Sequence, residues 1–98
     1  MRIITKEPLK QYVERHPDSR TALQEWVGKV EASQWNSFAD VRRTFGDVDM
    51  PGNQHYVFNI HGGHHRLVVV VKFFNRTILV RWIGTHAEYD KIRDVTLL

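Results

Sequence analysis

The sequence contains no cysteine, only three prolines and no long apolar run. Without cysteine the chain forms neither disulfides nor thiolate metal sites, which suits a reducing compartment. Its longest apolar stretch, residues 67–71, is far too short to cross a bilayer, and its first residues do not resemble a signal peptide. These absences lead us to expect a cytoplasmic protein that does not contact a membrane.

The length and charge of the chain set the next limits. Its 98 residues can bury one modest core, so we expect a single domain over residues 1–98. The sequence has 14 lysines and arginines against 11 acidic residues, which gives a formal net charge of +3. A mildly basic surface permits an anionic partner such as RNA but does not require one.

The first half of the chain carries helical patterns. A helix is predicted from about Lys6 to His16, because the residue before a proline avoids the helical region. A second helix is predicted after Asp18 or Ser19, and a shorter third helix after Ser37. Apolar residues at three- and four-residue spacing predict that these helices face a core: Leu9, Tyr12, Val13, Ala22, Leu23, Trp26, Val27, Val30, Phe38, Val41 and Phe45.

The second half carries strand patterns. Residues 46–54 are predicted to form a loop, and strands are predicted over 55–60, 65–74 and 77–84, with turns at 62–63 and 75–76. Residues 85–88 have the spacing of a capping box and predict a final helix that reaches about Asp94. We therefore predict an α+β fold, with N-terminal helices packed on a small antiparallel sheet and a short C-terminal helix.

Two-residue turns would fix which residues lie opposite each other in this sheet. They place Asn59 opposite Arg66, and Val70 opposite Arg81. One face is then apolar and must pack on the helices: Tyr56, Phe58, Ile60, Leu67, Val69, Val71, Phe73, Ile78, Val80 and Trp82. The opposite face holds His55, Asn59, Arg66, Lys72 and Arg81, set among Val57, Val68, Val70, Leu79 and Ile83. A slip of one residue would destroy this sorting, which favours the register.

Three cations on a partly apolar face require an explanation, because unpaired charges there repel one another. In a structural interpretation, Arg66, Lys72 and Arg81 extend to the rim of the sheet or pair with acids such as Glu88 and Asp90. In a functional interpretation, they form an anion site whose guanidinium groups hold a phosphate through forked hydrogen bonds. These two interpretations differ in function, and the pattern of charges does not choose between them.

The final helix adds groups that can transfer protons. His86 and Tyr89 are three residues apart and therefore lie on the same side of that helix. An imidazole and a phenol beside a phosphate site suit RNA cleavage. In that reaction the ribose 2′-hydroxyl loses a proton, the nonbridging oxygens are held, and the 5′-oxygen gains a proton.

These residues carry a resemblance to a known family. Residues 84–92, Gly-Thr-His-Ala-Glu-Tyr-Asp-Lys-Ile, resemble the C-terminal signature of HigB-type toxins of type II toxin–antitoxin systems, a branch of the RelE-like superfamily. The strand that starts at Arg66 and the order of helices and strands fit the same family. The resemblance implies a RelE-like fold and an mRNA interferase, an endoribonuclease that often acts on the translating 70S ribosome. It also implies a helix-turn-helix antitoxin of the HigA type, through which operator DNA would be reached only indirectly.

The resemblance also implies site residues. Arg66 and Arg81 match basic residues of the family's sheet, His86 and Tyr89 match the terminal motif, and Lys72 fits by geometry, so the expected catalytic residues are Arg66, Lys72, Arg81, His86 and Tyr89. The expected RNA-binding residues on the same face are Arg66, Lys72, Arg81, His55 and Asn59. No metal or cofactor is expected. His86 or Tyr89 would take the 2′-hydroxyl proton and the other would protonate the leaving oxygen, which leaves a 2′,3′-cyclic phosphate.

Other classes of function remain open at this point. Four histidines, His55, His61, His64 and His65, surround the turn at 62–63 and suggest a metal site, although their spacing matches no zinc motif. A non-catalytic nucleic-acid-binding module would also use basic and aromatic residues on a sheet face, and Phe74 is the one aromatic predicted on that face. A scaffold that binds an acidic partner is a further alternative.

Overall fold

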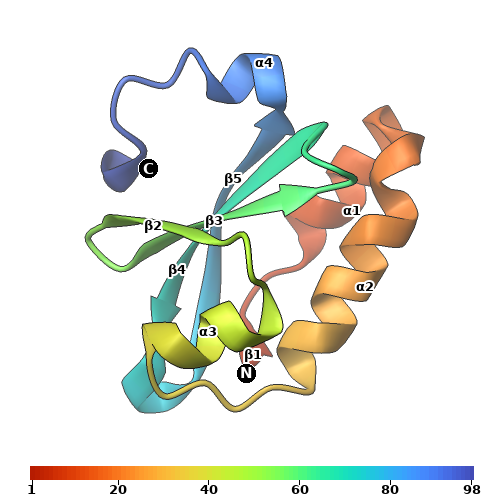
Figure 1. Cartoon of the computed structure of the whole chain (residues 1–98). Coiled ribbons are helices and arrows are strands. Elements are labelled where there is room, and N and C mark those ends of the chain that lie inside the picture. The colour runs from red at the N-terminus through yellow and green to blue at the C-terminus, as the bar shows by residue number, and fades with distance from the viewer.

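A five-stranded sheet lies at the centre of the computed structural model, which describes all residues 1–98 (Figure 1). Its strands are β1 (Arg2–Ile3), β2 (Asp49–Gly52), β3 (His55–Ile60), β4 (His65–Lys72) and β5 (Thr77–Thr85), in the order β1-β5-β4-β3-β2. β1 runs parallel to β5, and every other neighbouring pair is antiparallel. The predicted antiparallel sheet over β3, β4 and β5 is confirmed, and β1 and β2 extend it at the two edges.

Both edge strands are short. β1 has two residues, and β2 has four, with a register shift between Asp49 and Gly52. Residues 46–54, predicted as a loop, therefore contain a strand. Asn53 and Gln54 both have positive φ, 53° and 62°, which is the backbone of a tight hairpin turn between β2 and β3. The turn-forming residues of this segment make a hairpin connection rather than an open loop.

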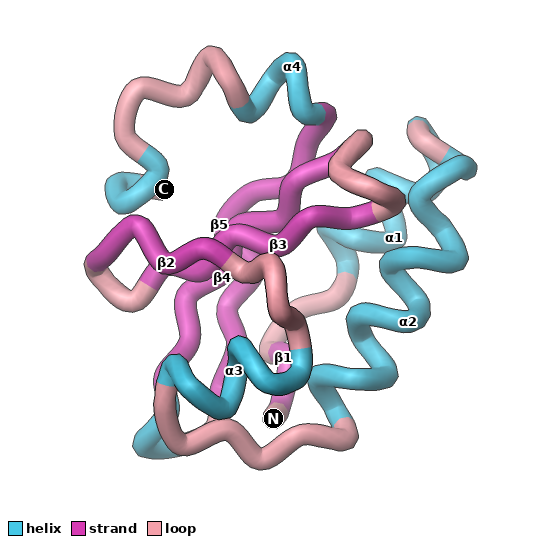
Figure 2. The backbone as a smooth tube through the Cα atoms, in the orientation of Figure 1, coloured by secondary structure: helices cyan, strands magenta, loops and turns pink.

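Helices cover one face of the sheet. They are α1 (Glu7–Arg15), α2 (Arg20–Glu31) and α3 (Phe38–Thr44), whereas α4 (His86–Tyr89) follows β5, and short 3₁₀ turns occupy η1 (Pro17–Ser19), η2 (Phe73–Asn75) and η3 (Val95–Leu97). The segment from α4 to η3 passes along the other face of the sheet (Figure 2). The predicted α+β fold is confirmed, but the final helix ends at Tyr89 rather than near Asp94. No helix combines the length and the apolar character needed to cross a bilayer.

The main core lies between the helices and the sheet. Phe58 of β3 packs edge-to-face against Trp26 and Phe45, with ring centroids 5.4 Å and 5.0 Å away. The other buried residues of the core come from both layers: Ile3, Leu9, Tyr12, Leu23, Val30, Trp35, Val41, Val48, Tyr56, Ile60, Leu67, Val69, Val71 and Ile78. The alternation along β3 and β4 therefore buries the side chains that the sequence predicts, whereas part of the helical stripe packs against the core only partly buried: Val13, Ala22, Val27, Phe38 and Phe45.

The strand registers agree with the prediction in one pair and differ in the other. Between β3 and β4, Asn59 lies opposite Arg66, as predicted. Between β4 and β5 the predicted register is wrong by two residues, because Lys72 lies opposite Thr77 rather than Leu79. Residues 73–75 form η2 and Arg76 adopts a φ of 55°, so the connection is longer than a two-residue turn. A shift of two residues keeps each side chain on its predicted face.

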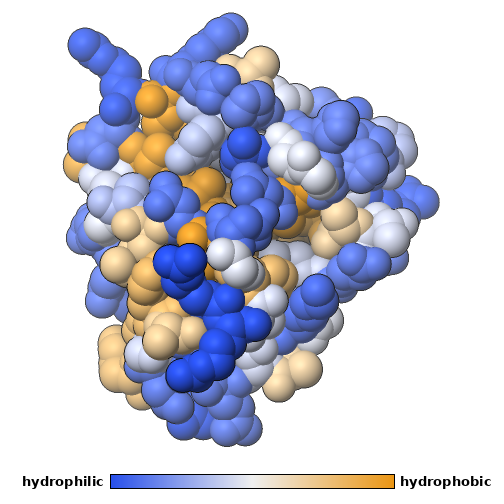
Figure 3. Space-filling view, in the orientation of Figure 1, coloured by the Kyte–Doolittle hydropathy of each residue, from blue (hydrophilic) through white to orange (hydrophobic).

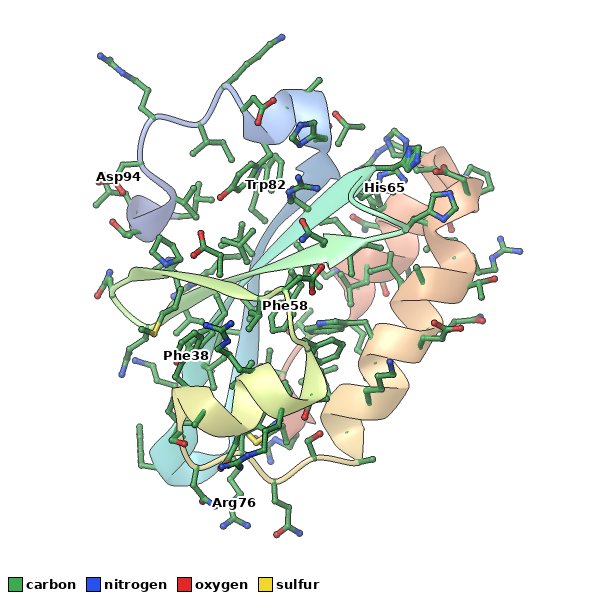
Figure 4. All side chains as sticks on the ribbon, in the orientation of Figure 1. Phe38, Phe58, His65, Arg76, Trp82 and Asp94 are labelled. Atoms are coloured by element: carbon green, nitrogen blue, oxygen red, sulfur yellow. The ribbon has the colours of Figure 1, made fainter.

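A β-bulge in β5, by contrast, moves the side chains beyond it to the opposite face of the sheet from the predicted one. Val80 lies opposite Val69 and Trp82 lies opposite Val68, so Arg81 is an extra residue between the two pairs. Beyond the bulge, Ile83 packs against the core, while Trp82 turns away from the helices (Figure 4). The predictions for Trp82 in the core and Ile83 on the other face are therefore both wrong.

The sheet face turned away from α1, α2 and α3 is called the outward face below. It carries Val57, Asn59, Arg66, Val68, Val70, Lys72, Arg81 and Trp82. Val57, Val68 and Val70 are buried although they lie outside the main core, because the segment that follows β5 returns over them. Apolar atoms still show between this C-terminal segment and β2 in the space-filling view (Figure 3). The outward face is thus an apolar floor with charged side chains around it.

Candidate active site

The start of α4 is fixed by its capping box. The Thr85 hydroxyl accepts a hydrogen bond from the Glu88 backbone N–H at 3.2 Å, and Glu88 Oε1 accepts one from the Thr85 N–H at 2.8 Å. The same backbone N–H and the Thr85 hydroxyl hold the pKa of Glu88 below its usual value. A helix of four residues has little stability alone, so this reciprocal pair sets the direction in which its side chains project.

Tyr89 of α4 lies against a cation and an indole of the outward face. The Arg66 guanidinium carbon is 5.9 Å from the centroid of the Tyr89 ring, and the Trp82 ring centroid is 6.1 Å from it. Arg66 Nη1 also donates a hydrogen bond to the Gly63 carbonyl, which ties the guanidinium to the turn between β3 and β4. A permanent cation and a phenol are therefore side by side at one end of the outward face.

The phenol of Tyr89 is held in its protonated form. Burial raises its pKa above the usual value, the negative charges of Asp49 and Asp90 raise it further, and the Arg66 charge opposes them. A phenol in this state donates hydrogen bonds at neutral pH. The surroundings of Tyr89 thus disfavour the phenolate form.

His86 lies at the outer side of α4. Its Nε2 is 3.4 Å from an Asp90 carboxylate oxygen, and its side chain is 53% exposed. Its backbone N–H donates to the His64 carbonyl at 2.9 Å, so this part of α4 borders the turn at 62–63. His86 and Tyr89 thus stand on one short helix, with Tyr89 turned to the sheet and His86 at the rim.

Lys72 and Arg81 belong to a second cationic cluster. Both line a shallow hollow with Val70 and residues 96–98, and the Lys72 ammonium donates to Gln54 Oε1 at 2.7 Å. Lys72 is six residues from Arg66 along β4, which corresponds to about 20 Å in an extended strand. Arg81 is exposed and lies, along the direction of the strands, between Arg66 and Lys72. The five expected catalytic side chains therefore do not converge on one point, and Arg66 and Tyr89 are the pair in direct contact.

The other two expected RNA-binding residues are already engaged. His55 is only 3% exposed, and its ring nitrogens bond to the carbonyls of Asn53 at 2.8 Å and Leu98 at 2.9 Å. Asn59 donates to an Asp47 carboxylate oxygen at 2.9 Å. The predicted role of His55 does not fit this placement, because its ring fastens the C-terminal segment to the sheet, whereas Asn59 remains exposed.

Sequence reasoning missed the position of Trp82. It lies beneath the C-terminal segment and forms part of the wall beside Tyr89 (Figure 4). Alternation along β5 assigns it to the core, and only the bulge at Arg81 reverses that assignment. Phe74, the aromatic predicted on this face, is instead 85% exposed in η2 at the far end of β4.

The histidines near the turn do not act as one group. His65 is buried, and it is hydrogen-bonded to the Tyr12 hydroxyl at 2.6 Å and to Asp18 at 2.7 Å. Burial raises the pKa of Tyr12 to about 12, and the hydrogen bond from His65 lowers the pKa of Asp18. His61 and His64 lie beside each other with ring centroids 4.9 Å apart, and no three such side chains are arranged to hold a metal ion.

Comparison with known proteins shows to which class of protein this chain belongs. The profile of a family described as HigB_toxin, the RelE-like toxic component of a toxin–antitoxin system, matches residues 19–92. This match covers α2, α3, all strands except β1, and α4, so it includes the outward face and its tyrosine. The molecule is therefore of the RelE-like toxin class.

Curated relatives agree with this match. The mRNA interferase HigB of Escherichia coli O6:H1 is 28% identical over 94 residues, which is 94% of this chain and 91% of that protein. The mRNA interferase toxin HigB of Escherichia coli K12 is 29% identical over 92% of this chain and 88% of its own length, and the mRNA interferase HigB of Shigella flexneri has the same values. The chain belongs to the HigB toxin family, as its terminal motif suggests.

Proposed function

We propose that this protein is a toxin endoribonuclease that cleaves mRNA at the outward face of its sheet. The contact between Arg66 and Tyr89 carries the proposal, because it puts a phosphate-binding cation beside a protonated phenol at an accessible edge. Family membership adds an antitoxin as partner, and the relatives named mRNA interferases make mRNA the substrate.

The chemistry follows from these two groups and needs no metal. The Arg66 guanidinium would hold the nonbridging oxygens and stabilise the charge that builds on the phosphorane. Tyr89 would donate a proton or a hydrogen bond to the leaving 5′-oxygen, because it carries an O–H donor and lies beside Arg66. Attack by the 2′-hydroxyl would then leave a 2′,3′-cyclic phosphate and a 5′-hydroxyl end.

The remaining expected residues would act around this centre. Lys72 lies too far along β4 to grip the same phosphate as Arg66, so it would bind a neighbouring phosphate of the RNA strand. Arg81 lies between them along the sheet and would add positive charge along the path of that strand. His86 stands at the rim and is one candidate for the acceptor of the 2′-hydroxyl proton. Its pairing with Asp90 would have to loosen for that role.

Two finer features of the proposal come from the family resemblance. The substrate would be mRNA on the translating ribosome, and the neutralising partner would be a helix-turn-helix antitoxin of the HigA type that also represses the operon. Cleavage assays with free mRNA and with ribosome-bound mRNA test the first feature. Co-expression with the neighbouring gene tests the second, since growth should recover when the antitoxin is present.

The test of catalysis compares three variants with the parent protein. Tyr89→Phe should slow cleavage by about 100-fold or more, and Arg66→Ala by roughly 100- to 1,000-fold, in line with typical acid–base and oxyanion contributions. His86→Ala should show a similar loss if His86 accepts the 2′-hydroxyl proton, and little loss if another group does. Arg76→Ala is the matched control, because Arg76 lies at the opposite end of the molecule from Trp82 (Figure 4). The proposal fails if Tyr89→Phe and Arg66→Ala both cleave and arrest growth like the parent.

A non-catalytic nucleic-acid-binding module is the second candidate. The observation that favours it is the pair of Trp82 and Tyr89 rings on the outward face, which could stack on bases without cutting the strand. Incubation with RNA, with and without ribosomes, separates the two functions. Discrete new 5′-hydroxyl ends support the nuclease, whereas retarded but intact RNA supports the binding module.

A further inference from the structure

One carboxylate of the outward face has no role in the chemistry described so far. Asp49 of β2 lies opposite Val57 of β3, which lies opposite Val68 of β4, which in turn lies opposite Trp82 of β5. Residues in one such row share a face of the sheet. Its neighbour Val48 is buried in the main core, so alternation also directs Asp49 to the outward face.

The other acidic side chains near this face are engaged. Asp47 accepts a hydrogen bond from Asn59, Asp90 pairs with His86, and Glu88 is held by the Thr85 N–H. Asp49 is exposed and makes neither a side-chain hydrogen bond nor an ion pair. A face that only bound phosphate would gain nothing from a free carboxylate, because like charges repel. A free carboxylate is useful there if it accepts a proton.

Asp49 also lies close enough to Tyr89 for its charge to matter. Burial is the main cause of the raised pKa of Tyr89, and the negative charge of Asp49 is the next. The row that holds Asp49 ends at Trp82, whose ring is 6.1 Å from the Tyr89 ring. Asp49 and Tyr89 therefore border the same part of the outward face, with Arg66 on the strand between β3 and β5.

We propose that Asp49 is the acceptor of the ribose 2′-hydroxyl proton, an inference that rests on the proposed nuclease function. The O2′–H bond breaks and its proton passes to the Asp49 carboxylate, while O2′ forms a bond to phosphorus. The bond from phosphorus to O5′ breaks, and O5′ takes the Tyr89 proton. Solvent then removes the proton from Asp49 and returns one to Tyr89, so that protons and charge balance over the cycle.

This assignment gives each group one task. Tyr89 keeps its proton and is a poor acceptor, and His86 lies at the rim in a pair with Asp90. Asp49 has no competing partner, and it faces the site from the strand farthest from α4. An acceptor and a donor on opposite sides of the scissile phosphate match the in-line geometry in which O2′ enters as O5′ leaves.

The test uses two synthetic mRNAs that differ at one atom. In one, the scissile 5′-bridging atom is oxygen, and in the other it is sulfur, which leaves as a thiolate and needs no proton donor. Single-turnover cleavage is measured on both, free and bound to ribosomes, with the parent protein, Asp49→Asn, Tyr89→Phe, His86→Ala and Glu14→Gln. Glu14 is an exposed residue of α1 and is the control for the loss of one negative charge.

Asp49→Asn should cleave both substrates about 100-fold more slowly than the parent, because deprotonation of O2′ is needed with either leaving group. Tyr89→Phe should be slow on the oxygen substrate and close to the parent on the sulfur substrate. Glu14→Gln should match the parent on both. Thermal melting checks that Asp49→Asn is folded, which its exposed position leads us to expect.

Three results would overturn the assignment. Parental rates for Asp49→Asn would do so, as would recovery of that variant on the sulfur substrate, which would place its effect on the leaving group. A defect on both substrates in His86→Ala alone would make His86 the acceptor. In each case the parent still cleaves, so the nuclease proposal survives; no cleavage by the parent in any condition would remove both proposals.

Discussion

A substitution at Gly84 should displace Tyr89 of α4 without changing Tyr89 itself. It is the last residue of β5 before Thr85, and it is buried beside the Trp82 ring. A methyl group added there would lie 2.5 Å from two carbons of that ring and 3.0 Å from Glu88 Oε1. The φ of Gly84 is not in the left-handed region, so alanine strains the site through space alone rather than through its backbone.

The size of the effect follows from these distances. Ordinary contact between carbons needs about 3.5 Å or more, so the indole must move by about 1 Å. Overpacking of this kind costs about 1–3 kcal/mol, which for a domain of this length lowers Tm by about 4–15 °C. The ring that moves supports Tyr89, and a displacement of about 1 Å at a catalytic group slows a reaction roughly 100-fold.

The assay measures both consequences on Gly84→Ala and on a matched variant. Gly28 in α2 has open space where its methyl group would lie, so Gly28→Ala should gain about 0.5–1 kcal/mol from helix propensity and cleave normally. Thermal melting gives the stability, and single-turnover cleavage gives the rate. A change in tryptophan emission of the folded protein that disappears in a Trp82→Phe background reports whether the Trp82 ring has moved, because Trp26 and Trp35 also emit.

The reasoning would be refuted by a Gly84→Ala protein that melts and cleaves like the parent. A protein that melts earlier but cleaves at the parental rate when fully folded would show that Tyr89 does not depend on the Trp82 wall. In that case the stability argument stands and the link from packing to catalysis is wrong.

The remaining predictions concern the ends of the sheet. Tyr12→Phe should lower the free energy of unfolding by about 1–3 kcal/mol, because it leaves the buried His65 Nδ1 without its partner; urea denaturation measures this, and an unchanged midpoint would contradict it. The hydrogen bond from His65 lowers the folded-state pKa of Asp18, so the contribution of this carboxylate is present at neutral pH and is lost as pH falls through that pKa. Asp18→Asn should therefore be less stable than the parent at neutral pH, with the gap closing as pH falls below the usual pKa of an aspartate, as urea midpoints against pH would show. Thr85→Ala removes the cap of α4 and should cost about 0.5–2 kcal/mol with a larger loss of cleavage than of stability, which parallel melting and rate measurements would reveal or deny. Excess EDTA should leave cleavage of free RNA unchanged, and a loss that added zinc reverses would instead support a metal site.

The sequence predicts β3 and β4 well because both carry strong alternation. Tyr56, Phe58 and Ile60 face the helices, and the tight turn at 62–63 sets Asn59 opposite Arg66. A register error of one residue there would expose the whole apolar set, so the hydrophobic pattern alone is decisive. The sequence also predicts the capping box of α4, because Thr85 and Glu88 bond to each other within one turn of the chain.

The sequence could not predict β5 to the same degree. Nothing in the composition of residues 73–76 distinguishes a 3₁₀ turn from a two-residue hairpin, and a register shifted by two preserves every face. The bulge at Arg81 has no hydrophobic signature either, because Trp82 and Ile83 are both apolar and exchange faces without an apparent penalty. As a result, sequence reasoning identified Arg66 and Tyr89 but not the indole beside them.

The same limit explains why Asp49 was missed. It lies in a segment rich in proline, glycine, asparagine and aspartate, which favours a loop over a strand. The pairing of Asp49 with Val57 depends on contacts with β3 rather than on local preference. Local sequence patterns therefore predict only part of the set of residues that lie on a sheet face built from four strands.

The interruption of β2 has a consequence for contacts between the sheets of separate molecules. Its four residues contain a register shift, so this border of the sheet leaves no long row of free backbone N–H and C=O groups. At the other border β1 pairs only with Thr77 and Ile78, and the helix α1 contacts β5. Another polypeptide therefore has little on which to add a strand at the β2 border, and copies of this chain lack a template there for joining their sheets into fibrils.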